Sequence, residues 1–277
     1  MLVAPAPAAE SAVYVMGDVH GQLARLTQLL QDAGLIDPDG LWTERPLWRG
    51  GTATLWFLGD FFDRGPAGLG VVDLVMRLQR EAAAAGGTVG ALLGNHEILI
   101  LAAQRCGPAR SGGGGTFLEC WQVNGGEPAD LDGLTARYTA WISRLPAMAL
   151  VADRLLIHAD SPIYARLGGS VAAVNAAVAG TLAGTDPVAY DRLLAAFAGR
   201  NLFSKGDGVG IQQAAAYLAQ FGGRQIIHGH TPISDGTGQE PTDVTTPRLY
   251  ADGLCVNVDG GLYQGGPGFL YRLPSLG

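Results

Sequence analysis

The chain has 277 residues, a formal net charge of −7 and a pI near 5.1. An acidic chain with a single lysine, Lys205, lacks the basic face that a nucleic-acid binder needs. Its apolar runs are far shorter than the ~20 residues of a membrane-spanning helix, so we expect neither nucleic acid nor a membrane as a partner. Residues 1–9 lack the basic start of a signal peptide, and three cysteines without a CxxC pair favour a reducing compartment. We therefore expect a cytoplasmic protein.

Three apolar segments in the first hundred residues are predicted strands, at 12–16, 54–58 and 89–93. Residues 22–33 and 69–85 lie between them and carry apolar side chains at helical spacing. An alternation of strand and helix predicts parallel strands joined by right-handed crossovers.

The second half of the chain continues this alternation. Residues 147–151 and 155–158 are predicted to form a hairpin, and the segments 255–259 and 269–273 are predicted strands of a second sheet packed on the first. We predict one α/β domain over residues 1–277, with two packed mixed β-sheets flanked by helices and a helical insertion at about 106–146. The remaining predicted helices are at 132–143, 171–183, 187–197 and 211–221.

Polar side chains follow five of the predicted strands. GDVHG (17–21), GDFFDRG (59–65) and GNHE (94–97) follow the first three, and His158 and His230 follow two later apolar runs. Ligand sites of open α/β sheets lie at the carboxyl ends of their strands. Carboxylate, amide and imidazole groups gathered there suit a hard or borderline divalent metal.

The spacing of these residues favours two ions. Asp18 and His20 are two residues apart, so in extended backbone both side chains point to one side and can bind one ion. Asp60 can bridge to a second ion through its two carboxylate oxygens. Two dications about 3.5–4 Å apart would also provide a local source of positive potential in this acidic chain. The amide oxygen of Asn95 and the imidazoles of His158 and His230 would complete the coordination of the second ion.

The motifs GDVHG, GDFFDRG and GNHE, followed by a strand-terminal His and by GHT, span residues 17–231. In this order they resemble the calcineurin-like metallophosphoesterases, and more narrowly their phosphoprotein-phosphatase branch with its bacterial and phage members. The resemblance implies the two-sheet sandwich of that family and a hydroxide between two divalent metals as nucleophile. The expected metal is manganese, with iron, zinc, cobalt or nickel as alternatives. The resemblance also implies that Asp63 orients His96, that His96 protonates the leaving oxygen, and that Arg64 holds the phosphoryl oxygens.

The sequence departs from that family in places. Ala159-Asp160 follows His158 where the family more often has glycine, and Thr231 follows His230 where family nucleases and phosphodiesterases have a second histidine. A second phosphate-binding cation is expected near 200–205, and Arg200 and Lys205 are both candidates. We expect a structural role for His228 rather than a metal bond.

The leading expectation is a phosphatase for phosphomonoesters, with phosphoserine or phosphothreonine in proteins as the main substrate class and small phosphoesters as another. One alternative is a diadenosine tetraphosphate or nucleotide pyrophosphohydrolase, which shares the front motifs. Another is a non-catalytic scaffold of the same fold. A scaffold would be expected to have lost ligands, whereas every expected ligand type is present here.

Overall fold

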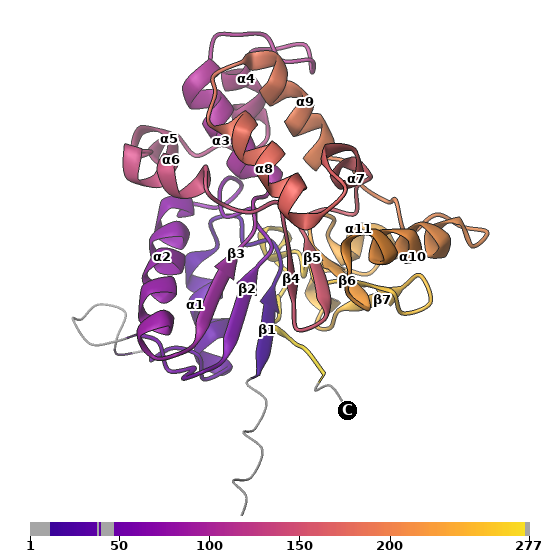
Figure 1. The fold of residues 1–277 in the computed structure, drawn as a ribbon. Helices are drawn as coiled ribbons and strands as arrows, with labels where there is room; N and C mark the ends of the chain where they lie inside the picture. The colour runs from indigo at the N-terminus through magenta and orange to yellow at the C-terminus, as the bar shows by residue number, and fades with distance from the viewer. Residues whose placement is uncertain (1–11, 38, 40–46, 275–277) are drawn as a thin grey trace, which may run out of the picture.

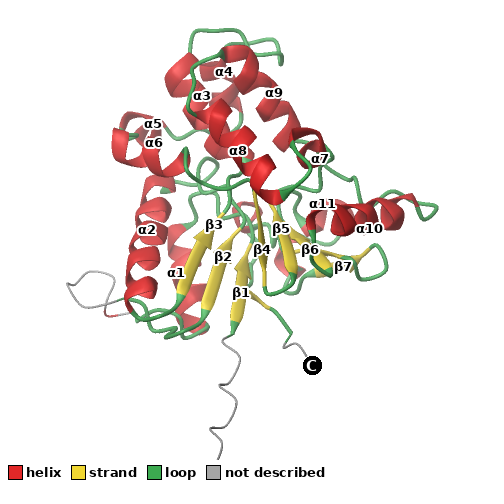
Figure 2. Cartoon of the chain, in the orientation of Figure 1, coloured by secondary structure: helices red, strands yellow, loops and turns green. Residues whose placement is uncertain are grey.

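The computed structural model describes residues 12–37, 39 and 47–274. The segment 1–9, on which the absence of a signal peptide was predicted, lies outside the described residues. The described chain forms two β-sheets flanked by helices, which confirms the predicted fold class (Figures 1 and 2). No helix among the described residues is both long and apolar enough to cross a membrane.

The first sheet has the strand order β3-β2-β1-β9. Its strands β1 (Val13–Met16), β2 (Thr54–Phe57) and β3 (Thr88–Ala91) are parallel, as the alternating pattern predicted. The last strand, β9 (Tyr271–Arg272), pairs antiparallel with β1. The prediction that this strand belongs to the second sheet is therefore wrong. β1 would otherwise present an unpaired edge, and the local sequence of β9 does not specify which edge it covers.

The second sheet has the order β4-β5-β6-β8-β7. The predicted hairpin is present, and its turn residues Ala152 and Asp153 both have positive φ. The strands of this sheet, in chain order, are β4 (Met148–Val151), β5 (Arg154–Ile157), β6 (Gln225–His228), β7 (Arg248–Tyr250) and β8 (Cys255–Asn257). Strands β5, β6 and β8 run parallel. They therefore end at one edge, as β1–β3 do in the first sheet.

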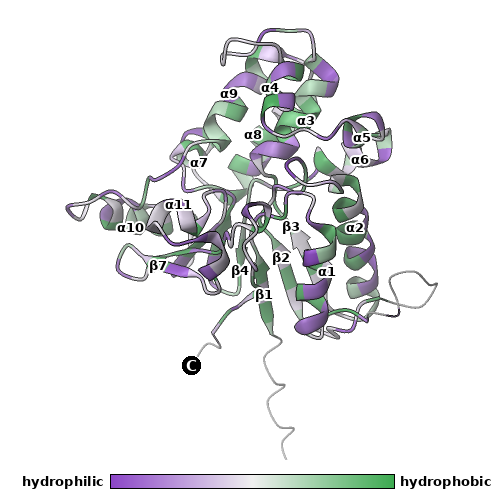
Figure 3. Ribbon diagram, turned by 180° about the vertical axis from the view of Figure 1, so that it is seen from behind, coloured by the Kyte–Doolittle hydropathy of each residue, from purple (hydrophilic) through white to green (hydrophobic). Residues whose placement is uncertain are grey.

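Apolar side chains fill the space between the two sheets. Val15 and Leu58 from the first sheet pack in one cluster with Leu156, Ile227 and Val256 from the second. A larger cluster lies under the helices, and Figure 3 shows the hydrophobic colour along β1 and β4 and the mixed faces of α1 (Leu23–Asp32) and α2 (Gly68–Ala84). Each sheet is therefore packed on both faces, by the other sheet and by helices. This packing holds the strands, and with them the residues at their ends, in fixed positions.

One of the helices predicted after β3 differs from the structure. The helix predicted at 132–143 begins only at Ala136, as α6 (Ala136–Ile142). A short helix that was not predicted, α5 (Pro128–Asp132), precedes it, and Gly133 follows α5. A Cβ at Gly133 would lie 2.5 Å from Leu69 Cδ1, so this glycine packs closely against α2. The other helices are α3 (Asn95–Cys106), α4 (Phe117–Val123), α7 (Ile163–Leu167), α8 (Val171–Leu182), α9 (Pro187–Phe197), α10 (Val209–Phe221) and α11 (Ile233–Thr237). Short 3-10 helices span Pro241–Asp243 and Leu262–Gln264.

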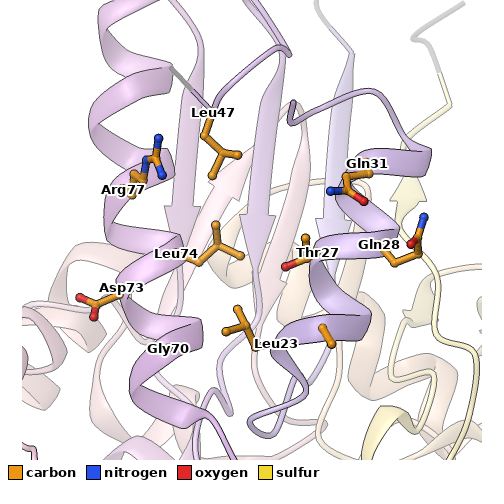
Figure 4. Close-up of a pocket in the computed structure, with 10 residues that line it drawn as sticks. Leu23, Thr27, Gln28, Gln31, Leu47, Gly70, Asp73, Leu74 and Arg77 are labelled. Atoms are coloured by element: carbon orange, nitrogen blue, oxygen red, sulfur yellow. The ribbon is translucent and has the colours of Figure 1, made fainter. Parts of the chain in front are cut away.

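A hollow of about 550 Å³ lies between α1 and α2 (Figure 4). Leu23 and Leu74 project into it from the two helices, and Leu47 lies at its side. None of the residues predicted to bind metal or phosphate lines this hollow. It is therefore separate from the site described next.

Candidate active site

The ends of five strands bring the predicted metal ligands together. Donor atoms of Asp18, Asp60, His158 and His230 all lie within 4.8 Å of one another. Asp60 also belongs to a second such group, with His20 and His96. All of these side chains are buried. Two ligand clusters that share one carboxylate are the arrangement that a dinuclear metal centre needs.

Asp60 lies between the two clusters. Its Oδ1 is 3.5 Å from His158 Nε2, and its Oδ2 is 3.6 Å from His20 Nε2. Each carboxylate oxygen therefore faces a different histidine. Asp18 has a similar intermediate place, because its Oδ2 lies 3.9 Å from His20 Nε2 while it also belongs to the cluster of His158 and His230.

Backbone carbonyls set the orientation of two imidazoles. His20 Nδ1 lies 2.9 Å from the Phe62 carbonyl, and His158 Nδ1 lies 2.8 Å from the Leu58 carbonyl. A carbonyl can only accept, so each Nδ1 carries the proton and each Nε2 turns a lone pair toward the centre. His158 Nε2 is also 3.0 Å from Asn95 Oδ1. Two acceptor atoms that face each other in this way are satisfied by a cation, so these residues fit a metal ion.

The charge state of the cluster also fits metal binding. Burial tends to raise the pKa of Asp60, but the surrounding histidines outweigh it and the net pKa is lowered. Burial lowers the pKa of His20, His158 and His230, which keeps these imidazoles neutral. Burial raises the pKa of Asp18, and the nearby Asp259 and Asp60 add to this effect. An ionised carboxylate with neutral imidazoles is the protonation state in which such side chains ligate metals, and crowded carboxylates favour a bound cation.

The turns that carry these residues have an uncommon backbone. His20, Asp60, Asp63, Arg64 and His230 all have φ between 47° and 69°. Non-glycine residues rarely adopt this region, and clusters of them are typical of functional sites. The motif glycines permit the close approach of these turns. At Gly59, with φ 101°, a Cβ would lie 2.5 Å from the Gly94 backbone nitrogen.

Glu97, the last residue of GNHE, connects two of the motifs. Its carboxylate accepts hydrogen bonds from the backbone N–H groups of Asp60 at 2.8 Å, Phe61 at 2.7 Å and Gly94 at 2.8 Å. Glu97 is fully buried. The motif contains this residue, but no role was predicted for it, because two of its three partners lie 36 and 37 positions away.

His96 lies against a buried carboxylate. Its Nδ1 is 2.6 Å from Asp63 Oδ2, and Trp121 of α4 donates its Nε1–H to Asp63 Oδ1 at 2.8 Å. Burial lowers the pKa of His96, but the charges of Asp60 and Asp63 outweigh it and the net pKa is raised. A protonated imidazole at this point can act as a general acid. Trp121 was not predicted, and its place beside Asp63 has no signal in the local sequence.

Arg64 is exposed and reaches over the cluster. Its two terminal nitrogens lie 3.1 Å from His20 Nε2 and 3.0 Å from His96 Nε2. The guanidinium carbon also lies 4.4 Å from the centroid of the Tyr263 ring. Contact with an aromatic face orients a guanidinium. Tyr263 comes from a glycine-rich segment at the end of the chain and was likewise not predicted.

The structure separates the two candidates for a second cation. Arg200 lies with one terminal nitrogen 3.1 Å from His230 Nε2, whereas Lys205 is exposed and no contact with the cluster is found for it among the described residues. The Ala198 carbonyl is 3.2 Å from the same His230 nitrogen. Both neighbours thus lie on the Nε2 side of the His230 ring.

The departure at Asp160 has a structural explanation. Asp160 accepts the backbone N–H of Phe203 at 2.8 Å and the hydroxyl of Tyr250 at 3.0 Å. His228 Nε2 lies 2.6 Å from the same hydroxyl. His228 belongs to neither ligand cluster. This buried network fixes the segment that follows Arg200.

Comparisons with known proteins place the chain in a family. The family model described as calcineurin-like phosphoesterase matches residues 11–245. Shewanella-like protein phosphatase 2 of Arabidopsis thaliana is 38% identical over 84 residues, which are 30% of this chain and 20% of that protein. The symmetrical bis(5'-nucleosyl)-tetraphosphatase of Salmonella paratyphi A is 37% identical over 91 residues, which are 33% of this chain and 25% of that protein. The matched segments thus span about a fifth to a quarter of these relatives.

Solved structures share the fold. A cold-active protein-tyrosine phosphatase of a psychrophilic Shewanella has a TM-score of 0.69 at 22% identity, and the match covers 96% of this chain and 76% of that one. A protein serine/threonine phosphatase from Saccharomyces cerevisiae has a TM-score of 0.57 at 16% identity, with 95% and 72% coverage. With the match to the family model over most of its length, this chain belongs to the calcineurin-like phosphoesterase family.

Proposed function

We propose that this protein is a metal-dependent phosphatase that hydrolyses phosphomonoesters, and that phosphoserine and phosphothreonine in proteins are its main substrates. The observation that carries the proposal is the buried His96–Asp63 pair beside two ligand clusters that share Asp60. This arrangement combines a proton donor with a place for two cations, as hydrolysis of an alkyl phosphate requires.

The ions would be held by the residues that converge at the strand ends. Manganese is the proposed metal, with iron, zinc, cobalt and nickel as alternatives, because the ligands are oxygen and imidazole groups without thiolate. When bound, such ions activate a water molecule as the nucleophile and offset the charge of the phosphoryl group. The proposed ligands are Asp18, His20, Asp60, Asn95, His158 and His230.

The other residues act on the substrate itself. His96 would donate its proton to the departing oxygen, and Asp63 would hold the ring and favour the protonated form. Arg64 and Arg200 lie near opposite clusters and would both hold phosphoryl oxygens. A planar guanidinium suits this task because it donates two parallel hydrogen bonds.

A diadenosine tetraphosphatase is the second candidate. The relative with that printed activity is about as similar to this chain as the plant protein phosphatase is. The two candidates differ in the group that leaves, since a dinucleoside polyphosphate loses a phosphorylated nucleotide and a phosphoprotein loses an uncharged side-chain alcohol.

A metal-by-substrate panel tests the proposal. The purified protein is assayed with Mn²⁺, Fe²⁺, Zn²⁺, Co²⁺ and Ni²⁺ on phosphoserine and phosphothreonine peptides, nitrophenyl phosphate and diadenosine tetraphosphate. We expect metal-dependent release of phosphate from the peptides, highest with Mn²⁺. A higher kcat/KM on diadenosine tetraphosphate would favour the second candidate, and no hydrolysis with any metal would favour a scaffold.

Asp60→Asn is the matched variant for this panel, and the exposed Asp252→Asn is its control. Asp60→Asn replaces one oxygen of the shared carboxylate with a poor ligand, so activity should be abolished and metal analysis should give fewer than two ions per chain. Asp252→Asn should leave both unchanged. An Asp60→Asn protein with two ions and full turnover would contradict the dinuclear assignment.

A further inference from the structure

A groove of about 420 Å³ opens directly beside the metal-ligand cluster. Asn95 and Ala198 line its inner end, and its walls come from α3, α4, α9 and the loop at 107–116. These helices lie together above the sheets in Figure 1. The volume is within the range of small-ligand sites. A substrate with its phosphoryl group at the cluster would extend into this groove.

The groove continues outward from there. A smaller hollow of about 190 Å³ shares Ser111, Gly113, Cys120 and Asn124 with it and adds Glu119 and Val123. The two hollows together form one surface depression from Asn95 to Glu119, which we call the α4–α9 groove. Most of its lining belongs to the insertion predicted at 106–146.

The α4–α9 groove has a negative lining. Asp191 lies on its α9 side and Glu119 on its α4 side, and no lysine or arginine lines either hollow within the described chain. Arg110, on the adjoining loop, donates to the Gly114 carbonyl at 2.8 Å, and its charge contributes to the lowered pKa of Glu119. Arg192 follows Asp191 in sequence but does not line the groove.

Both carboxylates are held in place by backbone N–H groups. Asp191 Oδ1 accepts from Gly112 at 2.7 Å, which joins the loop to α9. Glu119 Oε2 accepts from Thr116 at 2.7 Å, and this hydrogen bond lowers the pKa of Glu119. Both side chains therefore present fixed negative charge beside the path that leads from the cluster.

We propose that the α4–α9 groove binds the peptide that flanks a phosphorylated residue and selects peptides with lysine or arginine next to that residue. The inference rests on the proposed phosphatase function and adds a substrate preference to it. Basic flanking side chains would meet Asp191 and Glu119, whereas acidic ones would be repelled. A dinucleoside polyphosphate would bring further negative charge into a groove without a cationic lining residue, so it should be a poor substrate.

Three phosphoserine peptides of equal length, with lysine, alanine or glutamate on both sides of the phosphoserine, provide the test. At low ionic strength we expect kcat/KM to be about tenfold or more higher with lysine flanks than with glutamate flanks, in the order lysine, alanine, glutamate. The ratio should fall in 0.5 M NaCl. In the Asp191→Asn/Glu119→Gln protein it should fall to about threefold or less, while nitrophenyl phosphate hydrolysis stays within about twofold of wild type.

Two further variants separate this effect from general damage. Asn and Gln keep an oxygen acceptor for Gly112 and Thr116, so the loop should stay in place in the double variant. The exposed Asp252→Asn removes a charge far from the groove in sequence and should keep the full flank ratio. Ala195 is exposed on α9 and lines the groove, so Ala195→Trp should lower kcat/KM on all three peptides about tenfold and leave nitrophenyl phosphate hydrolysis nearly unchanged.

The outcomes distinguish this inference from the proposed function. If the three peptides are hydrolysed with equal kcat/KM, or fastest with glutamate flanks, the proposed preference of the α4–α9 groove for basic flanks is wrong. The proposed phosphatase function would still stand. The preference is also wrong if the double variant keeps the full kcat/KM ratio between lysine and glutamate flanks. If none of the three peptides is hydrolysed while nitrophenyl phosphate is, both the groove preference and the assignment as a protein phosphatase are wrong.

Discussion

His96 Nδ1 and Asp63 Oδ2 are 2.6 Å apart, and both side chains are fully buried. A carboxylate in this place fixes the ring and stabilises its charged form. The opposite ring nitrogen lies 4.0 Å from Asp60 Oδ2, beside the centre of the site. The pair is therefore suited to deliver a proton to an atom that reacts there.

His96→Asn should reduce turnover by ~10²–10⁴-fold on a phosphoserine peptide, because the alkoxide that leaves needs a proton. Nitrophenolate is a much better leaving group, so the loss on nitrophenyl phosphate should be smaller. The measurement is kcat for both substrates where chemistry limits the rate, together with metal content. Equal losses on the two substrates would remove the acid role from His96.

Asp63→Asn should change the pH profile. The pKa of His96 lies above its ordinary value of 6.5 because Asp60 and Asp63 outweigh the effect of burial. The acid must be protonated, so activity should fall as the pH rises through this pKa. Bound ions would offset the charge of Asp60, which leaves Asp63 as the persistent partner. Its removal should lower the pKa of His96 and move the alkaline limb of kcat to lower pH. If the alkaline limb of the Asp63→Asn profile lies at the same pH as that of wild type, a group other than His96 is the general acid.

Arg64→Ala should weaken phosphate binding without loss of the metals. Arg64 contacts ring nitrogens but is not among the proposed ligands, so metal analysis should match that of wild type. We expect a raised KM and weaker inhibition by inorganic phosphate, and Arg64→Lys should recover only part of both because an ammonium cannot donate two parallel hydrogen bonds. If phosphate inhibits the alanine variant as strongly as wild type, Arg64 has a structural role.

Glu97→Ala should destabilise the protein. It would leave three buried backbone N–H groups without an acceptor, at a cost of roughly 1–3 kcal/mol each. Urea unfolding should give the loss, and metal affinity should fall as well, since the turn of Asp60 is no longer held.

Glu119→Ala is the control for this variant. Glu119 also accepts a backbone N–H, that of Thr116, but at an exposed helix start where water can replace it. Its loss should lower stability much less. Equal effects of the two substitutions would show that Glu97 does not hold the two motifs together.

The sequence by itself determined where the proposed metal ligands lie along the chain. Residues such as Asp18, Asp60 and His158 could be chosen because each directly follows an apolar strand, and strand and turn patterns are local properties. The parallel order of β1, β2 and β3 also followed from local alternation. The strand and turn patterns depend only on residues that are neighbours in sequence.

The tertiary structure decided how these pieces meet. Trp121 reaches Asp63 across 58 positions, and no local pattern marks Tyr263 as the aromatic partner of Arg64. The position of Arg200 beside His230, and the pairing of β9 with β1 instead of the second sheet, also depended on packing between distant segments. Such contacts are set by how the two sheets and their helices pack together, and a strand or a loop residue carries no local record of the neighbour it will meet.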